Sequence, residues 1–214
     1  NFVFQSALFM ENKNYQEDLQ HIRKMMEKSS RFISLSGISG VFAGLFALAG
    51  AIYVYFFFKK NGVDYFEGTV KYYEKDIITH LVIVAMVVMV LAISSGAYFT
   101  IKKSKAHHLQ IWDATTKKLL YNFAIPLGIG GLFCAGLLYH GLHGLLSPAT
   151  LIFYGLALFN AGNYTFSDIK YLGLCEMALG IVSLFFLGYG LFFWAIGFGV
   201  LHIVYGLIMH KKYK

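Results

Sequence analysis

Residues 171–209 read YLGLCEMALGIVSLFFLGYGLFFWAIGFGVLHIVYGLIM, an apolar run whose single carboxylate is Glu176. As one helix this run would extend roughly 58 Å at 1.5 Å per residue, nearly twice the ~30 Å hydrocarbon core of a bilayer. It must therefore fold back on itself, and Gly188-Tyr189-Gly190 is the natural bend. The run predicts two antiparallel membrane spans, at about residues 171–188 and 191–209.

The apolar run at residues 119–161 has the same excess length, and a stretch from His140 to Pro148 breaks it. Two further uncharged or nearly uncharged runs, closer to the length of one span, come earlier in the chain. We therefore expect an all-α, polytopic integral membrane bundle of six transmembrane helices. The expected spans are residues 32–58, 77–101, 119–140, 145–161, 171–188 and 191–209.

Composition supports this fold class. The chain has 214 residues, of which 57% are hydrophobic and 14% charged, whereas soluble domains carry about 25% charged residues. The net charge of +7 does not indicate nucleic acid, because the Lys and Arg residues lie mostly at the ends of apolar runs. Six spans with both termini inside place every basic cluster on the cytoplasmic side, as the positive-inside rule requires.

The segment before the first span divides into two parts. Residues 1–9 resemble the remnant of a protease-cleavable tag and are excluded from functional reasoning. Residues 10–31 predict a cytoplasmic amphipathic helix at the membrane interface, with Leu19, Ile22 and Met26 on one apolar stripe. Residues 32–214 then form the transmembrane domain.

Small residues mark helix faces that can pack closely. In the first span, Gly37, Gly40 and Gly44 share a face, which predicts tight packing within the chain. In the last two spans, Glu176 lies on a small-residue stripe, and His202 lies on another with Gly199 and Gly206. The acid and the imidazole should therefore lie where helices meet, away from lipid.

The candidate functional site follows from counting. Glu176 lies thirteen residues before Tyr189 and His202 thirteen residues after it, so the two side chains should share a depth in the membrane and form a hydrogen bond or ion pair. Charged residues inside a bilayer are costly and often functional. We expect a buried polar pocket that opens toward the cytoplasm, and its further members should be Tyr205, Asn160 and Asn122.

Three interpretations of the Glu176–His202 pair stay open, and one of them is catalysis. A carboxyl group beside an imidazole can exchange a proton near neutral pH, as a transporter or channel for a small solute or ion requires. The structural alternative is that the pair is a hydrogen bond between helices, worth about 1 kcal/mol in a membrane.

A second set of residues, His80, His140 and His143, should lie near the outer face. Three imidazoles around an open position can bind a catalytic zinc ion, which would make the protein a membrane-embedded metal-dependent hydrolase. Against this, Gly141 and Gly144 interrupt the helix, and interfacial histidines without a ligand role account for the same pattern. The chain has no phosphate-binding loop or dinucleotide fingerprint, and we expect no cofactor.

The charged stretch from Asn14 to Phe32 and the Tyr171–Glu176 segment resemble a group of small six-span bacterial inner-membrane proteins of no known activity. The resemblance implies a multi-pass location in the bacterial cytoplasmic membrane. It leaves a third function class, a regulatory or assembly subunit, in which Tyr15–Arg31 and the Lys102–Lys118 loop bind a protein partner at the cytoplasmic face. The expected partners are then the lipid bilayer, such a protein or a second copy of the chain, and no nucleic acid.

Overall fold

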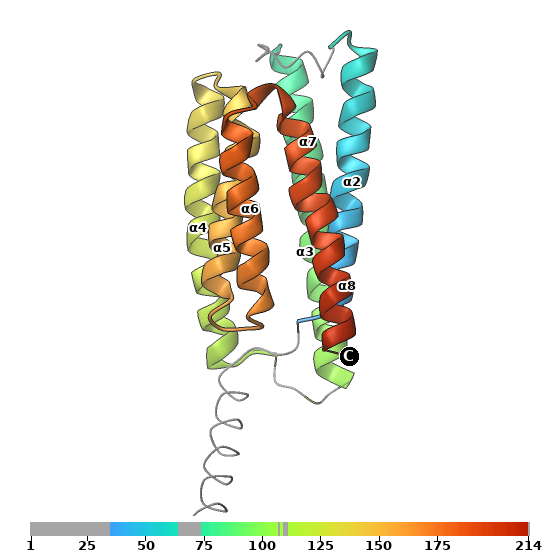
Figure 1. The fold of residues 1–214 in the computed structure, drawn as a ribbon, viewed down its shortest axis with the longest axis vertical. Helices are drawn as coiled ribbons and strands as arrows, with labels where there is room; N and C mark the ends of the chain where they lie inside the picture. Colours follow the sequence, from blue (N-terminus) through green and yellow to red (C-terminus); the bar gives the residue numbers. More distant parts are fainter. Residues whose placement is uncertain (1–34, 64–73, 107, 109–110, 214) are drawn as a thin grey trace, which may run out of the picture.

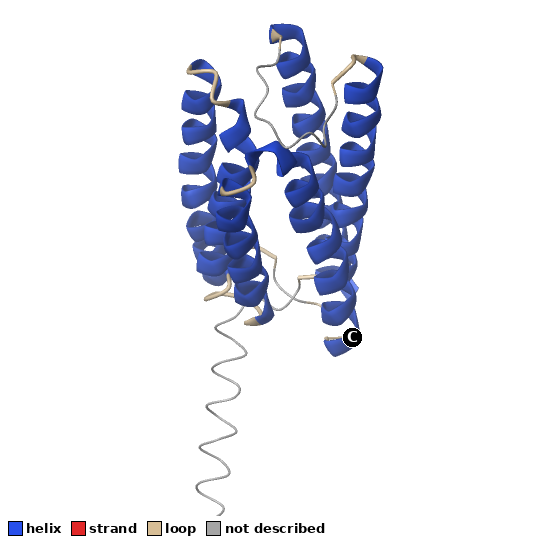
Figure 2. Ribbon diagram, turned by 45° about the horizontal axis from the view of Figure 1, so that its top comes forward, coloured by secondary structure: helices blue, strands red, loops and turns tan. Residues whose placement is uncertain are grey.

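The computed structural model describes residues 35–63, 74–106, 108 and 111–213. The expected tag remnant, the amphipathic helix at 10–31 and the start of the first span lie outside these residues, as does the partner-binding segment Tyr15–Arg31. Of the described residues 87% are helical and none is in a strand, so the expected all-α class is confirmed (Figure 2).

The helices follow the apolar runs of the sequence. Two 3-10 turns, η2 (His143–Leu145) and η3 (Leu187–Tyr189), join neighbouring helices, and a π-helical stretch, η4 (Ala195–Leu201), interrupts the last one. The longer elements are α2 (Gly37–Lys60), α3 (Lys75–Ala106), α4 (Ala114–Tyr139), α5 (Leu146–Ala161), α6 (Asp168–Leu184), α7 (Gly190–Trp194) and α8 (His202–Lys212).

Five of these helical segments are long and apolar enough to cross a membrane by length and composition, namely α2, α3, α4, η2 with α5, and the segment from η3 to α8. The 17 residues of α6 extend roughly 26 Å, slightly less than a ~30 Å hydrocarbon core. The outer face of α3 also exposes Ile83, Val87, Val90 and Ile93, each more than half exposed. These features are compatible with an integral membrane protein.

The helices form two groups that run side by side (Figure 1). In one group, α5 packs against both α4 and α6; in the other, α2 packs against α3, η4 and α8. One end of the molecule, here called the hairpin end, carries the α4–α5 turn and η3 (Figure 1). The opposite end, here called the C-terminal end, carries Tyr213 and the α5–α6 turn.

Glycine sets the packing of the last helix. Gly206 on α8 lies against the backbone of Gly37 and Val41, and Gly199 lies against Leu48, so this small-residue face contacts α2. The expected intrachain packing of the first glycine face is therefore confirmed. The last helix packs mainly on α2 and contacts α6 less extensively.

Both breaks have a local cause. After α4, Gly141 adopts φ +70°, and the N–H groups of Gly141 and Leu142 donate to the carbonyls of Leu138 and Leu137. This glycine C-cap satisfies two carbonyls at the helix end and turns the chain. The second bend is η3, which overlaps the Gly188–Gly190 position expected from the sequence.

Candidate functional site

Glu176 lies in the interior of the molecule, on the face of α6 that meets α5 and η4. Its side chain is 0% exposed, and one carboxylate oxygen, Oε1, lies 3.3 Å from Nδ1 of His202. The other oxygen lies against Gly197, where a Cβ atom would collide with it. The contact expected between Glu176 and His202 is thus present, at the boundary between the two helix groups.

The ring of His202 has a partner at each nitrogen. Nδ1 lies 3.0 Å from the carbonyl oxygen of Gly197, and Nε2 lies 2.8 Å from the hydroxyl of Tyr154 on α5. A carbonyl oxygen only accepts hydrogen bonds, so Nδ1 carries a proton. In the neutral ring Nε2 is then the acceptor, and the Tyr154 hydroxyl donates to it. The result is a chain of three polar side chains, Tyr154, His202 and Glu176, in which both oxygens of the Glu176 carboxylate lack a hydrogen-bond partner among the described residues.

The π-helical stretch η4 makes this arrangement possible. A π-helix pairs residues five apart, and the His202 ring contacts the carbonyl of Gly197, five residues earlier. The turn thereby places the His202 imidazole and Gly197, which has no side chain, beside the carboxylate of Glu176. Gly199 and Gly206 meanwhile remain against α2. Such π-helical turns occur frequently at functional sites.

Burial limits the protonation states of the pair. An ionised carboxylate that is removed from water without compensation costs several kcal/mol. Ionised Glu176 beside a neutral His202 is therefore the unfavourable state, whereas a proton on either partner leaves the pair without net charge.

Aromatic rings surround the chain. The Tyr154 ring lies 5.0 Å from that of Phe198 and 6.1 Å from that of Phe123, and Phe198 in turn lies 5.0 Å from Trp194. His202 itself is 6% exposed. These rings keep bulk water away from the imidazole on the side of α5 and η4.

The other residues expected in this pocket have different contacts. Asn122 donates to the carbonyl of Lys118 on its own helix, and the carbonyl of Asn160 accepts from Asn163. Tyr205 packs on Leu158, Ile169 and Leu172, and its hydroxyl is buried without a hydrogen-bond partner. The hydrogen bonds of His202 go to Tyr154 and Gly197, and a role of Tyr205, Asn160 and Asn122 in the polar site stays a prediction.

Tyr154 is the member of the site that the sequence reasoning missed. It comes eight residues after Leu146, where α5 begins, and Glu176 comes eight residues before Leu184, where α6 ends. The two residues thus share a depth, by the same counting that paired Glu176 with His202. The position of Tyr154 beside Glu176 follows from the packing of α5, which is the principal neighbour of α6.

The expected metal site is wrong. His80 stacks on Phe57 with ring centroids 4.2 Å apart and pairs with the Tyr53 hydroxyl at 2.9 Å. His140 and His143 belong to the turn after α4, which Gly141 separates from the helix. Within the described ranges no three His, Cys, Asp or Glu side chains are grouped so that they could hold a metal ion.

What the site can do chemically follows from its three side chains. A phenol, an imidazole and a carboxyl group next to one another are side chains that can each donate or accept a proton. Comparison of the chain with family models, curated proteins and solved structures finds no match in any of the three. The functional argument therefore rests on this geometry.

Proposed function

We propose that the chain is a six-span protein of a bacterial cytoplasmic membrane that moves a small solute or ion together with a proton. The observation that carries the proposal is the fully buried carboxyl group of Glu176, 3.3 Å from an imidazole, at the boundary between two helix groups. An ionisable residue at membrane depth is by default a candidate for a transport or proton pathway.

The position of the pair supports a role in transport over a purely structural one. Glu176 belongs to the α4–α6 group, and His202 belongs to the group with α2 and α3 (Figure 1). A proton that neutralises the pair changes the electrostatic interaction between the two groups. Coupling of proton binding to a relative movement of two helix groups is the usual principle of a secondary transporter.

The distribution of lysines supports the proposed orientation. The C-terminal end carries Lys102, Lys103, Lys105 and further lysines from α4, α6 and α8. At the hairpin end, Lys59, Lys60 and Lys75 are accompanied by Glu74 and Asp76. By the positive-inside rule the C-terminal end faces the cytoplasm.

Proton flux into proteoliposomes tests the proposal. Purified protein is reconstituted with a pH-sensitive dye inside the vesicles, and a potassium gradient with valinomycin drives protons inward. We expect wild-type flux above that of protein-free vesicles and a return to that background in Glu176→Gln, because an amide of the same size cannot bind or release the proton. Candidate solutes are then screened for acceleration of the flux.

The matched control is Glu74→Gln, which makes the same chemical change at an exposed residue before α3. This variant should retain wild-type flux. Circular dichroism and size-exclusion profiles establish that both variants fold. Background flux in the wild type, or undiminished flux in a folded Glu176→Gln variant, contradicts the proposal.

A further inference from the structure

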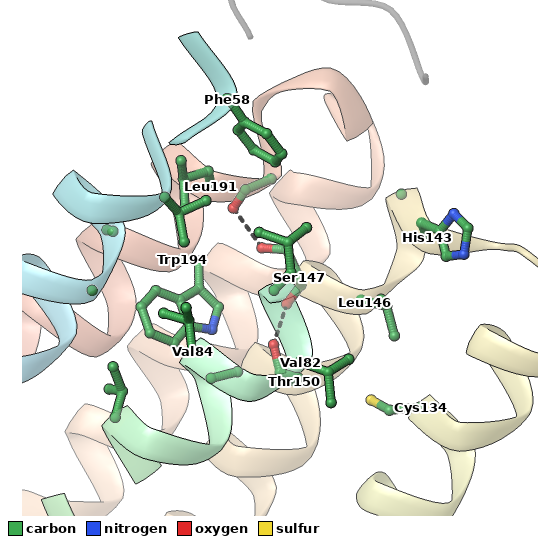
Figure 3. Close-up of a pocket in the computed structure, with 18 of the residues that line it drawn as sticks. Phe58, Val82, Val84, Cys134, His143, Leu146, Ser147, Thr150, Leu191 and Trp194 are labelled. Atoms are coloured by element: carbon green, nitrogen blue, oxygen red, sulfur yellow. Dashed lines mark hydrogen bonds between the residues drawn. The ribbon is translucent and has the colours of Figure 1, made fainter. Parts of the chain in front are cut away.

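A cavity of about 330 Å³ lies between the two helix groups, toward the hairpin end. Its walls come from α2, α3, α4, α5 and α7, and its lining does not include Glu176 or His202. Figure 3 shows Phe58 and Leu191 on one side, Cys134 and His143 on the other, and Trp194 between Leu191 and Val84. The cavity is about twice the size of the ~150 Å³ apolar cavity that accommodates benzene.

The lining is almost entirely apolar. Val54, Val84, Leu138 and Leu191 are typical of it. Ser147 and Thr150 add two hydroxyl groups, but Ser147 donates to the carbonyl of Gly190 and Thr150 donates to that of Ser147 (Figure 3). A water molecule in a protein needs two to four polar partners, so this cavity favours hydrocarbon over water.

The cavity can be reached from the side. It is bounded by both α3 and α4, yet α3 packs mainly on α2 and α4 mainly on α5. Of the lining residues on α3, Val82 is 38% and Met86 is 52% exposed, so they belong both to the cavity and to the apolar outer surface. In a bilayer this opening adjoins the acyl chains of the surrounding lipid.

The size and position of the cavity restrict its occupant. Its volume of about 330 Å³ accommodates a segment of one extended hydrocarbon chain. His143 lies at the hairpin end of the lining, where a lipid headgroup at the membrane surface would be.

We propose that this cavity binds one acyl chain of a membrane phospholipid, which enters between α3 and α4 and lies against Trp194. The binding is independent of the proposed transport, because no lining residue belongs to the Tyr154–His202–Glu176 chain. The two are nevertheless adjacent: Trp194 packs on Phe198 with ring centroids 5.0 Å apart, and Phe198 stacks on His202.

Tryptophan fluorescence tests the binding directly. The chain has two tryptophans, and Trp112, which is 68% exposed outside the cavity, is replaced in a Trp112→Phe parent so that Trp194 alone reports. Phosphatidylcholine with dibrominated acyl chains, which quench tryptophan on contact, is titrated into the detergent-solubilised protein. We expect saturable quenching, which unbrominated phosphatidylcholine reverses and glycerophosphocholine does not.

A pair of matched variants locates the site. Ala85 and Ala97 are both exposed alanines of α3, and only Ala85 lines the cavity. In the Trp112→Phe parent, Ala85→Phe should weaken the apparent affinity by about ten-fold or more, because the ring fills space that the chain needs. Ala97→Phe and Glu176→Gln should leave it unchanged, which separates this result from that of the flux experiment.

Three outcomes would overturn the proposal. One is quenching that rises in proportion to the probe without saturation, and another is failure of unbrominated phosphatidylcholine to restore the fluorescence. The third is equal affinity in Ala85→Phe and Ala97→Phe. The competition measurement needs only the parent protein, so it decides the question even when Ala85→Phe does not fold.

Discussion

Tyr154 and Tyr205 show how differently burial affects two identical side chains in the same molecule. The Tyr154 hydroxyl is hydrogen-bonded to Nε2 of His202, and the other ring nitrogen of that imidazole pairs with a backbone carbonyl. The Tyr205 hydroxyl is buried with no hydrogen-bond partner. At the scale of the residue, therefore, Tyr154 is part of a polar chain, whereas Tyr205 contributes through its ring.

This difference predicts opposite effects for two identical substitutions. Tyr154→Phe removes the donor to Nε2 of His202 and should lower the free energy of unfolding by about 1 kcal/mol. Tyr205→Phe removes an unpaired hydroxyl and should leave stability unchanged or slightly higher. Denaturant unfolding in detergent, followed by circular dichroism, measures both. A Tyr205→Phe variant that loses as much as Tyr154→Phe would contradict the assignment.

At the scale of the element, glycine decides which helices come together. Gly199 on η4 and Gly206 on α8 form one face that packs on α2, although the sequence placed this face at the contact with Glu176. The π-helical turn at Ala195–Leu201 resolves the conflict, because it lets His202 reach Glu176 while the glycines stay on α2. The last helical segment thereby contacts α2 through its glycines and Glu176 of the other group through His202.

Replacement of these glycines tests the packing. In Gly206→Ala the new Cβ would lie 2.6 Å from the backbone oxygen of Gly37 and 2.6 Å from the backbone nitrogen of Val41. Because backbone atoms cannot move aside easily, we expect the free energy of unfolding to fall by about 1–3 kcal/mol.

The control for this prediction is Gly128→Ala on α4, where nothing lies within 4 Å of the added Cβ. Alanine favours the helix by up to about 1 kcal/mol over glycine, so Gly128→Ala should be neutral or stabilising. Equal losses in the two variants, measured by thermal unfolding in detergent, would contradict the α2–α8 contact as the cause of the loss in Gly206→Ala.

At the scale of the whole molecule, several polar contacts between described residues join the helix groups. Tyr154 and Glu176 both contact His202. At the C-terminal end, Asp168 at the start of α6 accepts from Lys212 at 2.8 Å and from the hydroxyl of Tyr213. Asp168 precedes the apolar part of its helix, which begins at Tyr171. Partial burial raises the pKa of Asp168, but the hydrogen bonds from Lys212 and Tyr213 outweigh it and hold the pKa below its ordinary value.

The direction of this pKa predicts a pH dependence. An unfolded chain has an aspartate pKa of about 3.9, and the folded protein has a lower one, so the contact stabilises the fold at neutral pH and is lost as the pH falls below about 4. Asp168→Asn should cost up to about 1 kcal/mol at pH 7, as expected of an exposed ion pair. Near pH 3 the variant and the wild type should converge. A cost that is the same at pH 7 and pH 3 would contradict the role of the charge.

The apolar runs and their breaks could be predicted from the sequence because the thickness of a bilayer imposes a local length, which can be counted along the chain. The same counting placed Glu176 and His202 at one depth, and they were conspicuous because polar residues are rare in such runs. Counting does not say in which direction a side chain points. Tyr154 shares the depth of Glu176, but depth alone does not show that its hydroxyl points toward His202.

The sequence by itself thus determined the helical class, the positions of the bends and the acid–imidazole pair. Only the tertiary structure decided that α8 packs on α2, that Tyr154 completes the site, and that an apolar cavity remains between the helix groups. The physical reason is that lipid and protein interior are equally apolar, so a membrane helix carries little periodic signal for the face that meets its neighbour. That choice depends on the close approach of glycines from distant parts of the chain, which appears only once the helices are packed.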